Sequence, residues 1–337
     1  MTRPAEQADA QAAKCSVFVP TALRVAPDTS SRAECEPRSD YALCRSQQMT
    51  HLKDNRYRPA RSARTATAKP PEHELLLVAE QAVDLGARIF RQGRAHIGAL
   101  IAKGDRDFAT SVDLQIESAI RTSLATATPA IPFLGEEHGG GGPPGKREWV
   151  LDPIDGTINF SRDSPLCTIS LSLVTGGQPV LGIVDAPLLG ERFIARRGGG
   201  AFLNGERISV SSVGVLHEAI VGVADFKVGV GSEEENRVHL ALLARLAGTS
   251  LRVRMHGSAA LDLAWLAAGR LNATVMLSNL PWDVTAGLLL VREAGGVAFD
   301  LDGSDHRADS RFTLASEPSL AEPSLAEPVR QLVRAAM

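Results

Sequence analysis

Residues 149–160 carry two carboxylates, Asp152 and Asp155, three positions apart and separated by a proline that limits regular hydrogen bonding. They follow an apolar run that reads as a strand. Gly156 and Thr157 then open an expected helix, so that its first N–H groups and both carboxylates face one point. Hard divalent cations prefer carboxylate and carbonyl oxygens, and phosphate groups bind helix N-terminal amides. The alternative is an Asx-type turn in which Asp155 only caps the helix.

Further acids stand at similar positions elsewhere in the chain. Glu136 and Glu137 follow the apolar residues 131–134, as at a strand end. A second strand ending in paired acids beside the first would concentrate negative charge that a cation makes tolerable. Asp283 begins an expected helix over residues 283–294, and Asp113 lies at the start of another. Taken singly, each of these two acids also fits an ordinary helix cap.

The segments DFATSVD, GEE, LDPIDGTINF and PWD occur in this order, and GAFLNG and GSAA lie between the last two. Together they resemble the inositol monophosphatase family of Mg²⁺-dependent, Li⁺-sensitive sugar phosphatases, over roughly residues 73–335. The resemblance implies an α+β fold, the layered αβαβα sandwich of the inositol monophosphatase and fructose-1,6-bisphosphatase type. We assign that domain to residues 71–337.

The resemblance also implies a role for individual residues. Two to three Mg²⁺ ions are expected on Glu136, Asp152, the carbonyl of Ile154, Asp155 and Asp283. Glu136 is a catalytic residue in this reading, and Thr157 with Asp113 orients the attacking water. Asp155, Gly156 and Thr157 are expected to bind the substrate. Neighbouring metal ions about 3.5–4 Å apart can bridge a phosphate, stabilise the leaving oxygen and acidify a bound water.

The expected activity is hydrolysis of a small phosphomonoester, with inositol 1-phosphate as the leading substrate. Histidinol phosphate, fructose 1,6-bisphosphate and 3′-phosphoadenosine 5′-phosphate are alternatives, and a metal-stabilised regulatory protein of the same fold is a rival. Two positions depart from the family pattern. Ile158 replaces a frequent threonine and is tolerable if it packs. Met276 replaces an inositol-contacting acid, so we expect it to face the substrate and to weaken discrimination among substrates.

Other residues near the motifs are expected to have structural roles. We expect Glu137 to support the site without binding metal and Trp282 to pack beside Asp283. His138 and His256 are single histidines, which are more often satisfied structural groups than catalysts. Residues 139–142 read as a surface loop, because no helix start follows the glycines.

Elements that would position these residues can be read from periodicity. Helices are expected from Leu75 toward Arg91, from about Val112, and over residues 236–246, 258–268 and 283–294. Strands are expected over residues 147–151, 167–174, 179–184, 191–195, 218–224 and 297–300. Strands grouped after two opening helices, then mixed with further helices, favour a layered α+β arrangement over strict βαβ repeats.

Composition excludes several classes of protein. The 337 residues are 44% hydrophobic with a net charge of −3, so we expect neither a nucleic-acid nor a membrane partner. No metal-binding or disulfide pattern joins the four cysteines, and we expect a cytoplasmic enzyme. The resemblance implies a homodimer. Residues 1–70 lack a burial pattern and are expected to be a disordered extension. Translation from Met49, or a targeting or partner-binding arm, are the alternatives.

Overall fold

The computed structural model describes residues 72–94, 100–104, 107–143, 145–321 and 325–336. All of these lie in one compact unit, Thr67–Met337, and the other unit, Met1–Ala66, lies outside the described residues. The prediction for residues 1–70 therefore lies outside them too. Within the part of the chain that is described, no helix is both long and apolar enough to cross a membrane.

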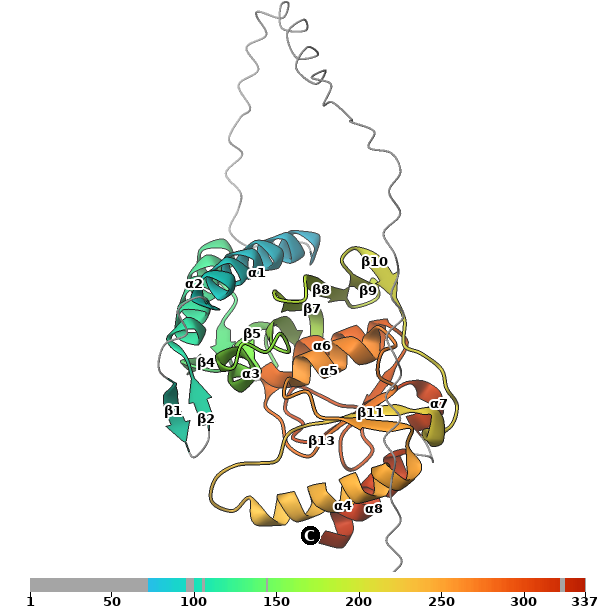
Figure 1. The fold of residues 1–337 in the computed structure, drawn as a ribbon. Helices are drawn as coiled ribbons and strands as arrows, with labels where there is room; N and C mark the ends of the chain where they lie inside the picture. The colour runs from blue at the N-terminus through green and yellow to red at the C-terminus, as the bar shows by residue number, and fades with distance from the viewer. Residues whose placement is uncertain (1–71, 95–99, 105–106, 144, 322–324, 337) are drawn as a thin grey trace, which may run out of the picture. The chain divides into compact units, whose positions relative to one another are not determined.

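The helices lie between strands that form an eight-stranded, a five-stranded and a two-stranded sheet (Figure 1). The helices are α1 Glu72–Arg94, α2 Ser111–Ala127, α3 Thr157–Ser161, α4 Glu233–Thr249, α5 Ala259–Ala267, α6 Pro281–Glu293, α7 Pro318–Leu320 and α8 Ala326–Ala336, with a 3₁₀ turn η1 at Leu216–Glu218. The strands are β1 Ile101–Gly104, β2 Asp107–Ala109, β3 Phe133–Gly135, β4 Gly139–Gly140, β5 Glu148–Asp155, β6 Thr168–Thr175, β7 Gln178–Ala186, β8 Glu191–Arg196, β9 Gly200–Leu203, β10 Glu206–Ile208, β11 Ile220–Val223, β12 Arg252–Arg254, β13 Ala273–Met276, β14 Val297–Phe299 and β15 Thr313–Ser316.

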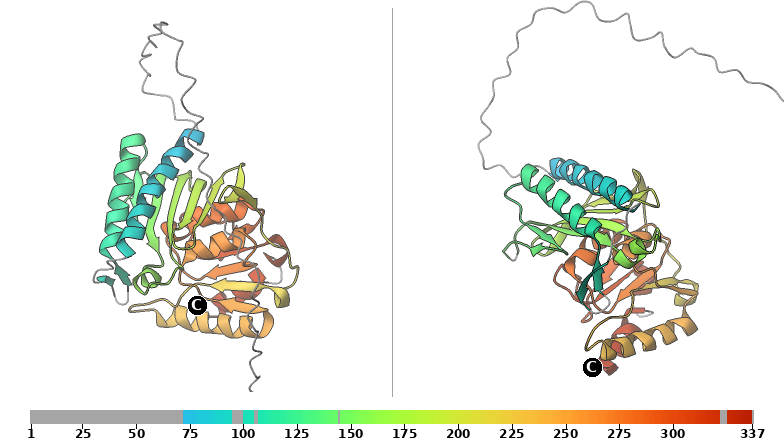
Figure 2. Two further views of the ribbon diagram at one scale, coloured as in Figure 1. Left: turned by 45° about the horizontal axis from the view of Figure 1, so that its top comes forward. Right: turned by 60° about the vertical axis from the view of Figure 1, so that its left-hand side comes forward.

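The larger sheet has eight strands in the order β10-β9-β8-β7-β6-β5-β3-β4. Its strands pair antiparallel except β3 with β5, which run parallel. Helices α1 and α2 cover one face of this sheet (Figure 2). Leu75, Ala79, Val83 and Phe90 of α1 recur at helical spacing and are at most 1% exposed, so this amphipathic stripe is what attaches α1 to the sheet.

The smaller sheet has five strands in the order β12-β11-β13-β15-β14. Helices α5 and α6 lie between the two sheets, and every residue of α6 from Val284 to Val291 is buried, the polar Thr285 included. Helices α4 and α8 cover the outer face of the smaller sheet (Figure 2). Five layers therefore follow one another as helix, sheet, helix, sheet, helix, which confirms the predicted α+β layered sandwich.

Two predicted boundaries were wrong in ways that concern the acids. Strand β5 does not end before Asp152 but continues through Pro153 to Asp155, with a shift in its pairing to β6 between the two aspartates. The proline thus disturbs the register without ending the strand. Helix α6 begins at Pro281, whose missing N–H is not needed at the first helical position, and Asp283 falls in the first turn.

Candidate active site

Asp152 and Asp155 lie at the carboxyl end of β5, on the larger sheet. Asp152 is 3% exposed, and its Oδ1 atom is buried without a hydrogen-bond partner. Burial and the nearby carboxylates of Glu136, Asp155 and Asp283 raise the pKa of Asp152 well above its usual value. Four acids from three separate parts of the chain therefore act on one another here.

Asp155 is held by the start of α5. Its Oδ2 accepts hydrogen bonds from Ser258 Oγ at 2.5 Å and from the Ala260 N–H at 2.8 Å, and its Oδ1 accepts from the Ala259 N–H at 3.2 Å. Burial raises the pKa of Asp155 to about 6 even though these bonds favour the carboxylate. The alternative that Asp155 caps α3 is wrong, because that helix has Gly156 at its N-cap position and no side-chain cap.

Asp283 reaches the cluster from α6. Asp283 is not the N-cap of α6, because Leu280 holds that position, but its Oδ2 accepts the Leu280 N–H at 2.6 Å from the third helical position. Burial raises the pKa of Asp283 to about 7, the Leu280 bond opposes this rise, and the charges of Asp155 and Glu136 add to it. Capping and membership of the acid cluster are thus combined in one side chain.

Glu136 and Glu137 follow β3 and contact Lys103 of β1. Lys103 Nζ lies 2.5 Å from Glu136 Oε1 and 3.1 Å from Glu137 Oε1. Although burial lowers the pKa of Lys103, these two carboxylates raise it. Burial, with the neighbouring charge of Glu136, raises the pKa of Glu137 to about 7. The side chain of Glu137 is 2% exposed, which agrees with a supporting position.

Thr157 links the site to α2. Its Oγ1 lies 3.1 Å from Asp113 Oδ1 and 3.0 Å from the Ile154 carbonyl oxygen, so the single hydroxyl hydrogen is donated to one of them at a time. Asp113 also accepts the N–H of Thr110 at 2.8 Å and the hydroxyl of the same residue. Burial raises the pKa of Asp113. Asp113 is therefore both the third helical residue of a capping box whose N-cap is Thr110 and a partner of Thr157.

One buried acid near the site was missed by the sequence reasoning. Glu117 of α2 is fully buried and accepts the N–H groups of Glu137 at 2.8 Å and His138 at 3.2 Å, which fixes the turn carrying Glu136. It also pairs with Arg121 at 2.8 Å and with His138 Nδ1 at 2.9 Å. The only sequence signal was an acid on the apolar face of α2, beside Ile116.

The expected role of Met276 was wrong. Its side chain is 1% exposed and belongs to the apolar cluster between the sheets, because all four residues of β13 are covered on both faces. Ile158 also differs from expectation, since it is 48% exposed and does not pack. Trp282 is half-buried, and its carbonyl accepts the Ser170 hydroxyl at 3.2 Å. His256 Nδ1 lies 2.5 Å from Asp262 Oδ1, and Asp262 is not one of the four acids of the cluster.

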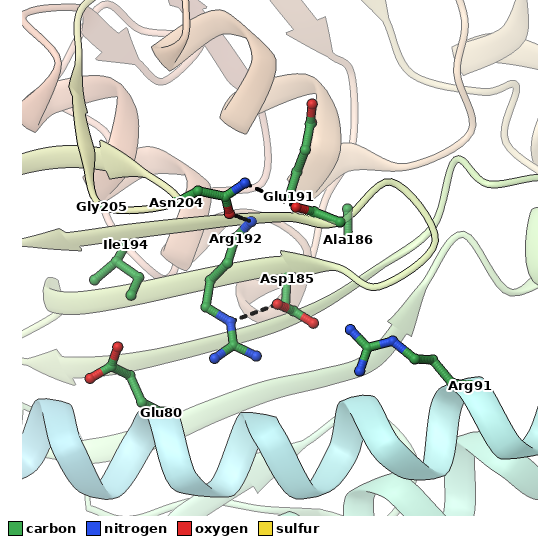
Figure 3. A pocket seen from close by; sticks show the side chains of 10 residues that line it. Glu80, Arg91, Asp185, Ala186, Glu191, Arg192, Ile194, Asn204 and Gly205 are labelled. Atoms are coloured by element: carbon green, nitrogen blue, oxygen red, sulfur yellow. Dashed lines mark hydrogen bonds and ion pairs between the residues drawn. The ribbon is translucent and has the colours of Figure 1, made fainter. Parts of the chain in front are cut away.

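A different hollow of about 420 Å³ lies between α1 and the β7–β8 hairpin (Figure 3). Its buried acid, Asp185, pairs with Arg192 Nε at 2.6 Å, and Arg192 also contacts Asp84 at 2.7 Å. Opposite charges compensate each other there. At the end of β5 carboxylates face carboxylates, so the acid cluster is the better candidate for cation chemistry.

The acid cluster fits hard cations by its donor set and its unpaired buried oxygen on Asp152. In the described residues, no three acidic, histidine or cysteine side chains already stand close enough together to hold an ion. Glu136 is instead paired with Lys103. The carboxylates therefore share one region, and side-chain adjustment would be needed to complete a coordination sphere.

Known proteins resemble this chain in both sequence and structure. The inositol monophosphatase family matches residues 72–335. Inositol-1-monophosphatase ImpA of Mycolicibacterium smegmatis is 37% identical over 248 residues, covering 74% of this chain and 89% of that protein. Fructose-1,6-bisphosphatase/inositol-1-monophosphatase of Thermotoga maritima is 37% identical over 208 residues, covering 62% and 77%.

Two solved structures share the fold. The inositol monophosphatase of Thermotoga maritima superimposes with a TM-score of 0.69 at 30% identity, covering 79% of this chain and 98% of that one. The inositol monophosphatase from Anabaena gives a TM-score of 0.67 at 25% identity, covering 78% and 96%. With the layered fold and the convergent acids, these matches show that the chain belongs to the inositol monophosphatase family and is a phosphoric monoester hydrolase.

Proposed function

We propose that this enzyme is a Mg²⁺-dependent phosphomonoesterase that hydrolyses inositol 1-phosphate and related small phosphorylated polyols. The observation that carries the proposal is the buried, unpaired Oδ1 of Asp152 among other carboxylates whose pKa values are raised. Such a set is unfavourable alone and favourable around divalent cations. Several relatives named for inositol 1-phosphate support the substrate.

Five residues would hold the metal ions in this proposal. They are Glu136, Asp152, Asp155 and Asp283 through carboxylates and Ile154 through its carbonyl oxygen, for two to three ions. When bound, Mg²⁺ acidifies a water molecule and stabilises the charge on the phosphate and the leaving oxygen. The bonds from Ser258 and Ala260 keep Asp155 oriented toward the cluster.

The remaining chemistry is assigned to residues that touch the water and the phosphate. Thr157 and Asp113 orient the attacking water, and the raised pKa of Asp113 makes its carboxylate a better proton acceptor. Glu136 follows β3, which pairs with β5, and contributes to activation beside Asp152. The attacking water gives up one proton toward Asp113 as its oxygen bonds to phosphorus, the bond from phosphorus to the alcohol oxygen breaks, and the leaving oxygen takes up one proton from a second water, so that ester and water give alcohol and phosphate. Asp155 and the backbone of Gly156 and Thr157 bind the phosphate.

Replacing Asp152 by Asn tests the proposal. Turnover should fall at least about 100-fold, because the charge that draws cations to the reacting phosphate is lost. Asp309→Asn is the matched control, since Asp309 is exposed and remote in sequence from the acids. An Asp152→Asn enzyme that keeps near wild-type turnover at saturating Mg²⁺ contradicts the assignment.

A panel of phosphomonoesters, each assayed with and without Mg²⁺, identifies the substrate. It should contain inositol 1-phosphate, histidinol phosphate, fructose 1,6-bisphosphate, 3′-phosphoadenosine 5′-phosphate and glycerol 2-phosphate. We expect inositol 1-phosphate to be accepted with modest preference. Binding of Mg²⁺ without turnover of any of these would favour a regulatory protein of the same fold. We further propose a cytoplasmic homodimer, which light scattering on the purified protein tests.

A further inference from the structure

Three buried polar side chains form a chain of hydrogen bonds that ends in the turn just before α6. His306 and Thr313 are fully buried, and Asn279 is 6% exposed. The His306 Nε2 and Thr313 Oγ1 atoms are 2.7 Å apart, and Thr313 Oγ1 is 2.7 Å from Asn279 Oδ1. These residues lie on three separate segments: the loop before β15, β15 itself and the turn between β13 and α6. None of them belongs to the acid cluster.

The direction of each bond in this chain is determined by the groups available. Asn279 Nδ2 donates to the Ser310 carbonyl at 2.9 Å, which fixes the amide so that Oδ1 is an acceptor for Thr313. The Thr313 hydroxyl gives its one hydrogen to Asn279 and must therefore accept from His306 Nε2–H. Because Nδ1 has no hydrogen-bond partner and burial lowers the pKa of His306 to about 4, His306 is neutral.

Asn279 immediately precedes the N–H that orients Asp283. In addition to its side-chain bonds, its own N–H donates to the Arg311 carbonyl at 3.0 Å. The next residue, Leu280, donates its N–H to Asp283 Oδ2 at 2.6 Å. Three hydrogen bonds of Asn279 therefore hold the turn that directs the Leu280 N–H toward Asp283. Leu280 itself is 39% exposed, so packing of its side chain contributes little to holding the turn.

We propose that Thr313, acting through Asn279, is a positioning residue that sets the orientation of the Asp283 carboxylate toward the metal ions. The inference rests on the proposed function, which makes Asp283 a metal-binding carboxylate. Without the Thr313 hydroxyl, Asn279 Oδ1 loses its donor and the turn gains freedom. Asp283 would then spend more of its time in orientations unsuited to a cation. Removing a group that is hydrogen-bonded directly to a metal-binding side chain typically changes metal affinity by 10–100-fold.

Thr313→Val tests the proposal because it removes the hydroxyl and keeps the shape of the side chain. Binding of Mn²⁺ to metal-free protein, followed by the EPR signal of free Mn²⁺, measures the effect independently of turnover. We expect the Kd for Mn²⁺ to rise about tenfold, at the lower end of that range because Thr313 acts through Asn279. Thr313→Ser keeps the donor and should bind Mn²⁺ within about twofold of wild type.

Thr274→Val is the matched control for loss of a buried threonine hydroxyl. Thr274 is fully buried in β13, next to β15, and its Oγ1 has no hydrogen-bond partner. Its replacement should leave the Kd for Mn²⁺ unchanged. Should Thr313→Val fail to fold, Thr313→Cys, with a weaker donor of similar size, replaces it and is expected to weaken Mn²⁺ binding in the same direction.

The outcomes distinguish a failure of this inference from a failure of the proposed function. Thr313→Val that is less stable than wild type yet binds Mn²⁺ equally well would show a purely structural role and overturn the inference. Equal weakening by Thr274→Val would overturn it too. A wild-type protein that binds no Mn²⁺ would instead contradict the proposed function, on which this inference depends.

Discussion

Metal-free protein should lose stability as the pH rises from 5 to 7. The titration of Asp283 gives the size of its contribution to this loss in the free energy of unfolding. Its pKa is 3.8 in the unfolded chain and about 7 in the folded protein. Between these values the unfolded state has released the proton and the folded state keeps it, so raising the pH favours unfolding. The slope is about 1.4 kcal/mol per pH unit while the folded state keeps its proton and falls to half of that at pH 7, so the loss between pH 5 and 7 is about 2 kcal/mol.

Thermal unfolding of EDTA-treated protein measures this loss. About 2 kcal/mol corresponds to a fall in Tm of about 4–8 °C for a unit of this size. Asp283→Asn should flatten the dependence by that amount, because the proton no longer titrates, whereas exposed Asp309→Asn should keep the wild-type slope. Added Mg²⁺ should raise the Tm more at pH 8 than at pH 5, since it binds the ionised carboxylates.

The result that refutes this reasoning is a metal-free Tm that stays constant or rises between pH 5 and 7 and is unaffected by Asp283→Asn. That outcome would mean that the carboxylate is as well solvated in the folded protein as in the unfolded chain. Glu137 and Asp155, whose pKa values are raised to about 7 and about 6, act in the same direction. The difference between wild type and Asp283→Asn therefore isolates the contribution of Asp283 to the pH dependence of stability.

Four further perturbations have defined outcomes. Glu117→Ala should destabilise the protein by about 3–5 kcal/mol in urea denaturation, because buried donors lose their charged acceptor; a change below about 1 kcal/mol would contradict this. Gly182→Ala should cost about 1–3 kcal/mol, since a Cβ would lie 2.8 Å from the Ala286 carbonyl oxygen. Gly248→Ala, in open space on α4, should instead stabilise by about 0.5–1 kcal/mol. LiCl at millimolar concentration should inhibit turnover relative to NaCl of equal ionic strength, and equal rates in both salts would remove lithium sensitivity from the proposal.

The acids of the site could be predicted because each stands at a chain position with its own local signal. Asp152 and Asp155 follow an apolar strand, Glu136 follows another, and Asp283 opens an apolar helix. Their convergence came from the family resemblance, because no local pattern states which strand ends lie together. Pairing of β3 with β5 places Glu136 beside Asp152, and α6 lying across the sheet brings Asp283.

What was missed depends on contacts between distant segments. Glu117 resembles a surface partner of Arg121 one helical turn away, and only tertiary packing makes it a buried acceptor. Ser258 binds Asp155 across a long sequence separation. Met276 was misjudged because its position in the family pattern specifies a place along β13 and does not specify where the side chain points. A strand covered on both faces buries alternate side chains in either direction.

The central place of α6 has a consequence for biosynthesis. The inner face of the larger sheet and three of its acids are translated well before α6, which both covers that face and delivers Asp283. A nascent or shortened chain that lacks α6 therefore exposes an apolar sheet face, the kind of surface that promotes aggregation. Protection from aggregation and completion of the acid cluster are thus achieved by one late-synthesised helix. A pool of incompletely made chains is consequently inactive, and chaperones or proteases can recognise it by the same uncovered surface.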